Sequence, residues 1–262
     1  MPASEVYRAS PERGDHVLAH RLAAAAGRHL VAIRSGEPGV GARGDREANS
    51  LLLERLAHAR PADKVLSEEA ADDPARLDAD RVWIIDPLDG TREFTEPGRR
   101  DWAVHVALWG AGALIAGAVA LPALGTVLST WRLPRIGTDP ARTVVVSRSR
   151  PPALLPALLA RWPAAVLPMG SAGAKTAAVL TGVATAYVHA GGQFEWDSAA
   201  PVAVAAACGL SVRRVHNLPL RYNQRDPVLP DLAICRPREA ASLWRALDEL
   251  AESANGDPVR TD

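Results

Sequence analysis

The order of helix-like and strand-like segments predicts a chain of two lobes, an α+β lobe followed by an α/β lobe. In the first half, two amphipathic helical patterns precede a run of strand patterns separated by short turns. In the second half, strand and helix patterns alternate, which is typical of a β-α-β layer. The polar stretch 132–142, which contains Pro and Gly, separates the two patterns. We therefore expect one lobe over residues 1–138 and another over residues 139–262.

The first lobe is expected to begin with two helices. Apolar residues recur on one face over Val17–Ile33, and a second amphipathic helix is predicted over Arg46–Ala59. Four glycines between them indicate a loop that ends at Asp45, whose carboxylate can cap the second helix. The strands expected after these helices are Lys64–Ser67, Arg81–Ile85, Trp102–Trp109, Leu114–Leu121 and Thr126–Trp131.

The second lobe is expected to alternate strands with helices up to its C-terminal helix. The expected strands are Thr143–Val146, Ala165–Leu167, Ala184–His189 and Leu232–Cys235. The expected helices are Pro151–Trp162, Ala174–Leu180, Trp196–Cys208 and Glu239–Leu250.

The composition argues against several classes of function. Lys and Arg number 30, as do Asp and Glu, so a net charge of zero gives no general attraction to a nucleic acid polymer. No apolar run reaches the roughly 20 residues of a membrane span, and the charged N-terminus lacks an apolar signal core, so a cytoplasmic protein is expected. Cys208 and Cys235 are isolated and show neither metal-ligand nor redox spacing.

The segment Asp86-Pro-Leu-Asp-Gly-Thr91 places two aspartates directly after an apolar strand. Pro87 fixes its own φ and Gly90 permits a backbone conformation that other residues avoid, so a turn can direct both carboxylates and the Leu88 carbonyl at one point. Two carboxylates at such a point repel each other. Because Mg²⁺ prefers oxygen ligands and would relieve this repulsion, we predict a magnesium site here.

Together with Trp196-Asp197-Ser-Ala-Ala200, this segment resembles the paired signature of the inositol monophosphatase superfamily of Mg²⁺-dependent phosphatases. Glu68-Glu69 after a short strand and Asp45 at a loop-to-helix junction fit the same pattern in the family's order. The resemblance implies a layered αβαβα sandwich of the sugar-phosphatase type. It also implies two to three Mg²⁺ ions per site, a small phosphate ester as substrate, and either a monomer or a homodimer.

By position, the resemblance implies the metal ligands. Glu68, Asp86 and the Leu88 carbonyl resemble the ligands of a first ion. Asp86, Asp89 and Asp197 resemble those of a second ion.

The resemblance also implies the catalytic groups. Asp45, with Glu68 acting through water, resembles the support for a weaker third ion. Thr91 and Asp45 resemble the pair that orients the attacking water. Gly90 and Thr91 are expected to offer backbone N–H groups to the phosphate.

Within the superfamily, LSEE, DPLDGTREF and MGSAGAK resemble the CysQ-type 3′(2′),5′-bisphosphate nucleotidase branch. This implies hydrolysis of 3′-phosphoadenosine 5′-phosphate, and of the corresponding phosphosulfate, in sulfate assimilation, with sensitivity to lithium. Ser171 and Lys175 are expected to contact substrate. The alternatives are an ordinary helix N-cap for Ser171 and an ordinary surface residue for Lys175. The alternatives are activity on inositol 1-phosphate or fructose 1,6-bisphosphate, and an inactive metal-binding scaffold.

A bisphosphate substrate needs a second cationic group, and five arginines lie between 132 and 150. Among them Arg148 is the predicted substrate contact, because it follows a strand. Glu195 is expected either to bind a sugar hydroxyl or to be an ordinary surface acid.

Overall fold

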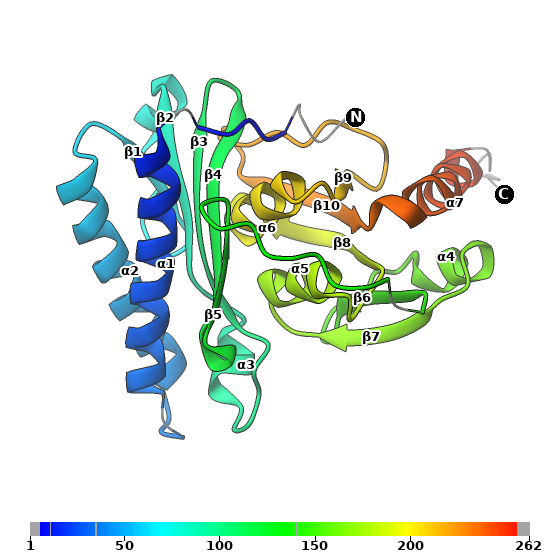
Figure 1. The fold of residues 1–262 in the computed structure, drawn as a ribbon, viewed down its shortest axis with the longest axis horizontal. Helices are drawn as coiled ribbons and strands as arrows, with labels where there is room; N and C mark the ends of the chain where they lie inside the picture. The colour runs from blue at the N-terminus through cyan, green and yellow to red at the C-terminus, as the bar shows by residue number, and fades with distance from the viewer. Residues whose placement is uncertain (1–5, 11, 35, 140, 256–262) are drawn as a thin grey trace, which may run out of the picture.

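The computed structural model describes residues 6–10, 12–34, 36–139 and 141–255, and in these it shows five layers (Figure 1). Two sheets alternate with three layers of helices, which confirms the predicted αβαβα sandwich. The outer helices are α1 (Arg13–Ile33) and α2 (Val40–Ala59) on one side and α4 (Leu155–Arg161) and α7 (Pro237–Asn255) on the other. The middle layer contains α5 (Ala172–Thr181) and α6 (Glu195–Ala207).

The first sheet has the strand order β1-β2-β3-β4-β5. Its strands are β1 (Lys64–Ser67), β2 (Arg81–Asp89), β3 (Ala103–Gly110), β4 (Ala113–Leu121) and β5 (Thr126–Ser129). β1 runs parallel to β2, and the other neighbours are antiparallel. Short 3₁₀ turns, η2 (Pro74–Asp78) and η3 (Pro122–Leu124), precede β2 and β5.

The second sheet has the order β7-β6-β8-β10-β9. Its strands are β6 (Thr143–Ser147), β7 (Ala165–Met169), β8 (Ala186–Phe194), β9 (Ser211–Arg213) and β10 (Val228–Cys235). β6 pairs in parallel with both β7 and β8, as the predicted β-α-β alternation requires. β10 is antiparallel to β8 and β9, so the sheet is mixed.

Three apolar clusters fill the spaces between the five layers. One lies between α1, α2 and the first sheet and includes Trp83 and Trp102. A second surrounds α5 and α6 between the sheets, and a third packs α4 and α7 on the second sheet. No helix in the described part of the chain is long and apolar enough to cross a membrane.

The start of α2 differs from the prediction. Two of the four glycines taken as a loop, Gly41 and Gly44, lie inside the helix. The helix begins at Val40 rather than Arg46, so Asp45 is a helix residue and not the N-cap. A Cβ atom on Gly41 would lie 2.8 Å from Thr91 Cγ2, so this glycine permits close packing against the segment after β2. The close packing directs Asp45 towards that segment.

Several other boundaries differ as well. β2 continues to Asp89 instead of ending at Ile85, and β8 continues to Phe194 instead of ending at His189. The short strand β9 was not predicted, because three residues carry too little periodicity to identify.

Candidate active site

A cavity of about 310 Å³ is lined by residues from both sheets. All five predicted metal ligands contribute to its wall: Glu68, Asp86, Leu88, Asp89 and Asp197. The first four follow β1 or end β2, whereas Asp197 lies in the first turn of α6. The fold therefore brings together ligand candidates that are up to 129 positions apart in the sequence, from Glu68 to Asp197 (197 − 68 = 129).

The end of β2 has an irregular backbone that suits this role. Asp86 pairs with His105 and Asp89 with Ala103, and the register shifts between the two aspartates. Asp86 Oδ1 accepts a hydrogen bond from the Leu88 N–H at 3.0 Å, which closes a tight turn. Gly90 then adopts φ +89°, the left-handed conformation expected of it.

Asp89 is held by groups from the far side of the cavity. Its Oδ2 accepts hydrogen bonds from Ser171 Oγ at 2.5 Å and from the Gly173 N–H at 3.0 Å. Burial raises the pKa of Asp89, but the nearby His105 and Lys175 charges and the Ser171 hydrogen bond outweigh it and lower the pKa to about 2. Ser171 is also the N-cap of α5, because its Oγ accepts from the Ala174 N–H. The N-cap role considered for Ser171 is therefore present, and its contact with substrate stays a prediction.

The remaining carboxylates have too few positive partners. Burial, followed by the charge of Asp197, raises the pKa of Glu68 to about 7, although its side chain is open to solvent. Burial and the charge of Asp89 raise the pKa of Asp197 to about 6. The pKa of Asp86 lies well above its ordinary value, because burial is reinforced by Glu68 and Asp89. Crowded carboxylates with a backbone carbonyl among them are a donor set that fits divalent cations such as Mg²⁺.

Asp45 and Thr91 meet at the edge of this cluster. Thr91 Oγ1 lies 3.2 Å from Asp45 Oδ1 and 3.2 Å from the Leu88 carbonyl oxygen. Burial and the charge of Glu69 raise the pKa of Asp45 to about 6. The predicted pair is thus in contact, beside the predicted metal-binding carbonyl of Leu88.

The raised pKa values predict an unusual dependence of stability on pH. Glu68, Glu195, Asp45 and Asp197 have folded-state pKa values of about 6 to 7, so between about pH 4 and 7 the folded state binds more protons than the unfolded state. The free energy of unfolding without metal should therefore fall as pH rises through this window. His189, with a pKa lowered to about 4 by burial, and His20, whose pKa burial also lowers, oppose this trend, but they are two groups against four.

Denaturant unfolding at pH 5 and pH 7.5 in EDTA checks this prediction. Saturating Mg²⁺ should remove or reverse the difference, because metal binding favours the deprotonated carboxylates. Greater stability at pH 7.5 than at pH 5 in EDTA would contradict the prediction.

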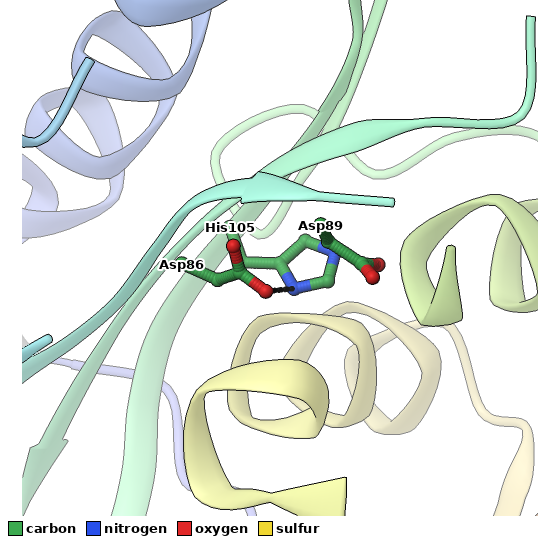
Figure 2. A group of neighbouring side chains, drawn as sticks. All are labelled: Asp86, Asp89 and His105. Carbon is green, nitrogen blue, oxygen red and sulfur yellow. Dashed lines mark ion pairs between the residues drawn. The ribbon is translucent and has the colours of Figure 1, made fainter. Parts of the chain in front are cut away.

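His105 is a site residue that the sequence analysis missed. It lies between Asp86 and Asp89 beneath the end of β2, and side-chain atoms of the three fall within 4.8 Å of one another (Figure 2). Its ring is fully buried in β3. The available signal was a lone histidine in an apolar strand, which by itself does not indicate that an aspartate lies opposite.

The predicted substrate contacts divide into two groups. Gly90, Thr91, Ser171 and Lys175 line the cavity, and Lys175 is buried there with its Nζ donating to the Gly170 carbonyl. Burial lowers the pKa of Lys175 from its ordinary value.

Arg148 and Glu195 do not line the cavity. The Arg148 guanidinium is paired with Glu93, at 2.5 Å, and with Glu96. Both carboxylate oxygens of Glu195 accept backbone hydrogen bonds, from Asn223 at 2.7 Å and from Gln224 at 2.8 Å. Glu195 was expected to be either a surface acid or a sugar contact. In the structure it is buried and holds the backbone of Asn223 and Gln224 instead.

A second set of polar side chains lines the same cavity. Arg150 belongs to it, and its guanidinium has no hydrogen bond or ion pair with any described residue. His189 and Gln193 are buried, and the Nε2 atom of each lacks a hydrogen-bond partner within the described residues. Unpaired buried polar atoms are costly, so these groups suit a ligand rich in hydrogen-bond acceptors.

A model of the inositol monophosphatase family matches residues 35–136 and 138–252. The chain belongs to this family. The prediction of the family is therefore confirmed, and with it the class of enzyme, a phosphoric monoester hydrolase.

Similar proteins support the nucleotidase branch. The chain is 53% identical over 218 residues to the 3′-phosphoadenosine 5′-phosphate phosphatase of Mycobacterium tuberculosis, covering 79% of this chain and 82% of that protein. It is 46% identical over 260 residues to the protein of the same name from Mycobacterium leprae, covering 91% and 95%. The crystal structure of CysQ from Bacteroides thetaiotaomicron matches with a TM-score of 0.75 at 25% identity, covering 87% of this chain and 99% of that one.

Proposed function

We propose that this protein is a Mg²⁺-dependent phosphatase that removes the 3′-phosphate of 3′-phosphoadenosine 5′-phosphate, in sulfate assimilation. The single observation that supports this most strongly is one cavity that carries both the carboxylate cluster and a separate set of cationic and hydrogen-bonding side chains. We extend the proposal to 3′-phosphoadenosine 5′-phosphosulfate as a second substrate and to inhibition by Li⁺.

The carboxylate cluster supports the phosphatase chemistry. We propose that Glu68, Asp86 and the Leu88 carbonyl hold one Mg²⁺ ion, that Asp86, Asp89 and Asp197 hold a second, and that Asp45 supports a weaker third. When bound, these ions would polarise the phosphate ester and make a bound water acidic. Glu68, which lines the cavity beside the other carboxylates, is placed to accept a proton from such a water.

The pair of Thr91 and Asp45 supports the positioning of the water. The single hydroxyl hydrogen of Thr91 is directed towards Asp45 Oδ1 or the Leu88 carbonyl, which leaves an oxygen lone pair able to accept from water. Because the Asp45 carboxylate is a strong acceptor, it favours the rotamer of the Thr91 hydroxyl in which the hydrogen is directed away from the water. We propose that the backbone N–H groups of Gly90 and Thr91 bind the phosphate oxygens beside it.

The second set of side chains supports a bisphosphate substrate. Burial and the charges of Lys175 and Arg150 lower the pKa of His189 to about 4, so its ring is neutral near pH 7 and close to both cations. We propose that Arg150, Lys175, His189 and Gln193 receive the 5′-phosphate and the ribose. Arginine suits this role because its planar donors match phosphate oxygens.

A substrate panel tests the proposed function. Phosphate release is measured with Mg²⁺ and with 3′-phosphoadenosine 5′-phosphate, inositol 1-phosphate and fructose 1,6-bisphosphate. We expect the largest kcat/KM for the nucleotide. An equal or larger value for either sugar phosphate would overturn the substrate, and no release from any of them by the folded protein would indicate a metal-binding scaffold instead.

Arg150→Gln is expected to lower the preference for a bisphosphate. The ratio of kcat/KM for 3′-phosphoadenosine 5′-phosphate to that for 3′-AMP should fall by about 10- to 100-fold, because a charge-assisted contact worth about 1.5–3 kcal/mol is lost. Arg148→Gln is the matched control, since Arg148 does not line the cavity and its guanidinium is already paired with Glu93 and Glu96. If both variants change the ratio equally, or neither does, Arg150 does not read the second phosphate.

A further inference from the structure

His105 connects the two lobes behind the carboxylate cluster. From β3, its Nδ1 lies 3.2 Å from the Trp196 carbonyl oxygen in the first turn of α6, and its Nε2 lies 3.2 Å from Asp89 Oδ2. Nδ1 is also 3.9 Å from Asp86 Oδ2 (Figure 2). The next residue along α6 is Asp197. One buried ring therefore contacts or adjoins every proposed ligand of the second ion.

The ring is fixed in its orientation. A carbonyl oxygen only accepts hydrogen bonds, so Nδ1 carries the hydrogen that it directs to Trp196. Nε2 is near enough to Asp89 for a contact, but it lacks a well-directed hydrogen bond, and His105 itself does not line the cavity. The ring is thus placed to act on the ligands from behind rather than to touch substrate.

The start of α5 leaves room for this ring. A Cβ atom on Gly173 would lie only 2.4 Å from His105 Nε2, closer than such atoms approach in proteins. The N–H of the same glycine donates to Asp89 Oδ2. His105, Gly173 and Ser171 therefore surround one oxygen of Asp89, a residue that lines the cavity.

We propose that His105 is a positioning residue that sets the spacing between Asp86 and Asp89 on β2 and Asp197 on α6. This rests on the proposed function, because the ion that needs all three carboxylates is the second of the proposed pair. The first proposed ion takes its ligands from β2 and the residue after β1 alone. Loss of the His105 contacts should therefore weaken one ion and spare the other.

Binding of Mn²⁺ to the metal-free protein, counted by electron paramagnetic resonance, tests the proposal without measuring activity. Three variants separate the contacts of the ring. Asn places its amide nitrogen near the position of Nδ1, Gln places its amide nitrogen near that of Nε2, and Leu fills the space with neither. The wild-type protein should bind at least two Mn²⁺ ions.

We expect His105→Leu to weaken one of these ions by about tenfold or more, which corresponds to about 1.4 kcal/mol, while the other changes less than about twofold. His105→Asn and His105→Gln should each retain part of the Mn²⁺ affinity. Asn keeps a nitrogen near the Trp196 carbonyl, and Gln keeps a nitrogen near Asp89. His16→Leu is the control, since His16 is a buried histidine that contacts Thr130 away from the cavity. Its Mn²⁺ binding should match that of the wild type.

The outcomes separate this inference from the proposed function. If the wild-type protein binds no Mn²⁺, the proposed function fails. If it binds two ions and His105→Leu binds them equally well, only the role of His105 fails. If His105 only fills space, the Leu variant should bind Mn²⁺ at least as tightly as the Asn and Gln variants. That result would also overturn the proposal. Should the Leu variant not fold, affinities of the Asn and Gln variants equal to the wild type would overturn it.

Discussion

Replacing Asp86 with asparagine is expected to abolish nearly all activity and, at the same time, to stabilise the metal-free protein. Asp86 is the one side chain assigned to both proposed ions, so kcat/KM should fall by about 10³-fold or more. Asparagine keeps an oxygen that can accept from the Leu88 N–H, so the turn at the end of β2 should persist.

The gain in stability follows from the raised pKa of Asp86. Burial and the neighbouring carboxylates make its ionised form unfavourable in the folded state, so above pH 4 its charge lowers the free energy of unfolding. The neutral amide removes this cost. In EDTA at pH 8, the melting temperature should rise by about 2–4 °C for each kcal/mol gained.

Thermal unfolding in EDTA and in saturating Mg²⁺, together with phosphate release, checks both parts. Asp80→Asn serves as the control because Asp80 is an exposed acid just before β2. Mg²⁺ should raise the melting temperature of the wild type and of Asp80→Asn much more than that of Asp86→Asn. A variant at position 86 that keeps substantial activity, or that is destabilised in EDTA, would contradict the account.

Thr91→Val should lower kcat by about 10²- to 10³-fold with little change in metal affinity. Valine has nearly the shape of threonine but cannot accept from or donate to the attacking water, and correct placement of a reacting group is worth about this much. Among the described residues, the Thr91 hydroxyl has only two hydrogen-bond partners, Asp45 Oδ1 and the Leu88 carbonyl, and it is the donor to both.

Steady-state kinetics over a range of Mg²⁺ concentrations distinguishes this effect from a loss of metal. Thr91→Ser keeps the hydroxyl and should recover most of kcat. If the serine variant is as slow as the valine variant, the methyl group of Thr91 rather than its hydroxyl determines kcat. The claim that the hydroxyl orients the attacking water would then be wrong.

The turn that carries Asp86 and Asp89 could be predicted from the sequence because its geometry is local. Pro87 and Gly90 specify an unusual backbone after an apolar strand, and the structure places Gly90 at positive φ. Asp197 and Glu68 lie far away in the chain, and only the resemblance to a known family connected them to this segment. Their arrival at one cavity is a property of the fold.

Other features depended on contacts that the local sequence does not show. Gly41 looked like a loop residue, but it lies in α2, where its missing side chain admits Thr91. His105 faces Asp86 only because β2 and β3 pair in that register. Arg148 and Arg150 are two positions apart, and the direction of Arg148 is set by Glu93 and Glu96, which are more than 50 positions away in the sequence. A sequence pattern gives no means of choosing between two such arginines.

Anomalous diffraction from a crystal soaked in Mn²⁺ would test most directly whether these carboxylates form a metal-dependent phosphatase site. We expect at least two ions in the cavity, one contacting Glu68, Asp86 and the Leu88 carbonyl and the other contacting Asp86, Asp89 and Asp197. Anomalous peaks found only elsewhere, or a cavity with no ion at saturating Mn²⁺, would contradict the proposed chemistry.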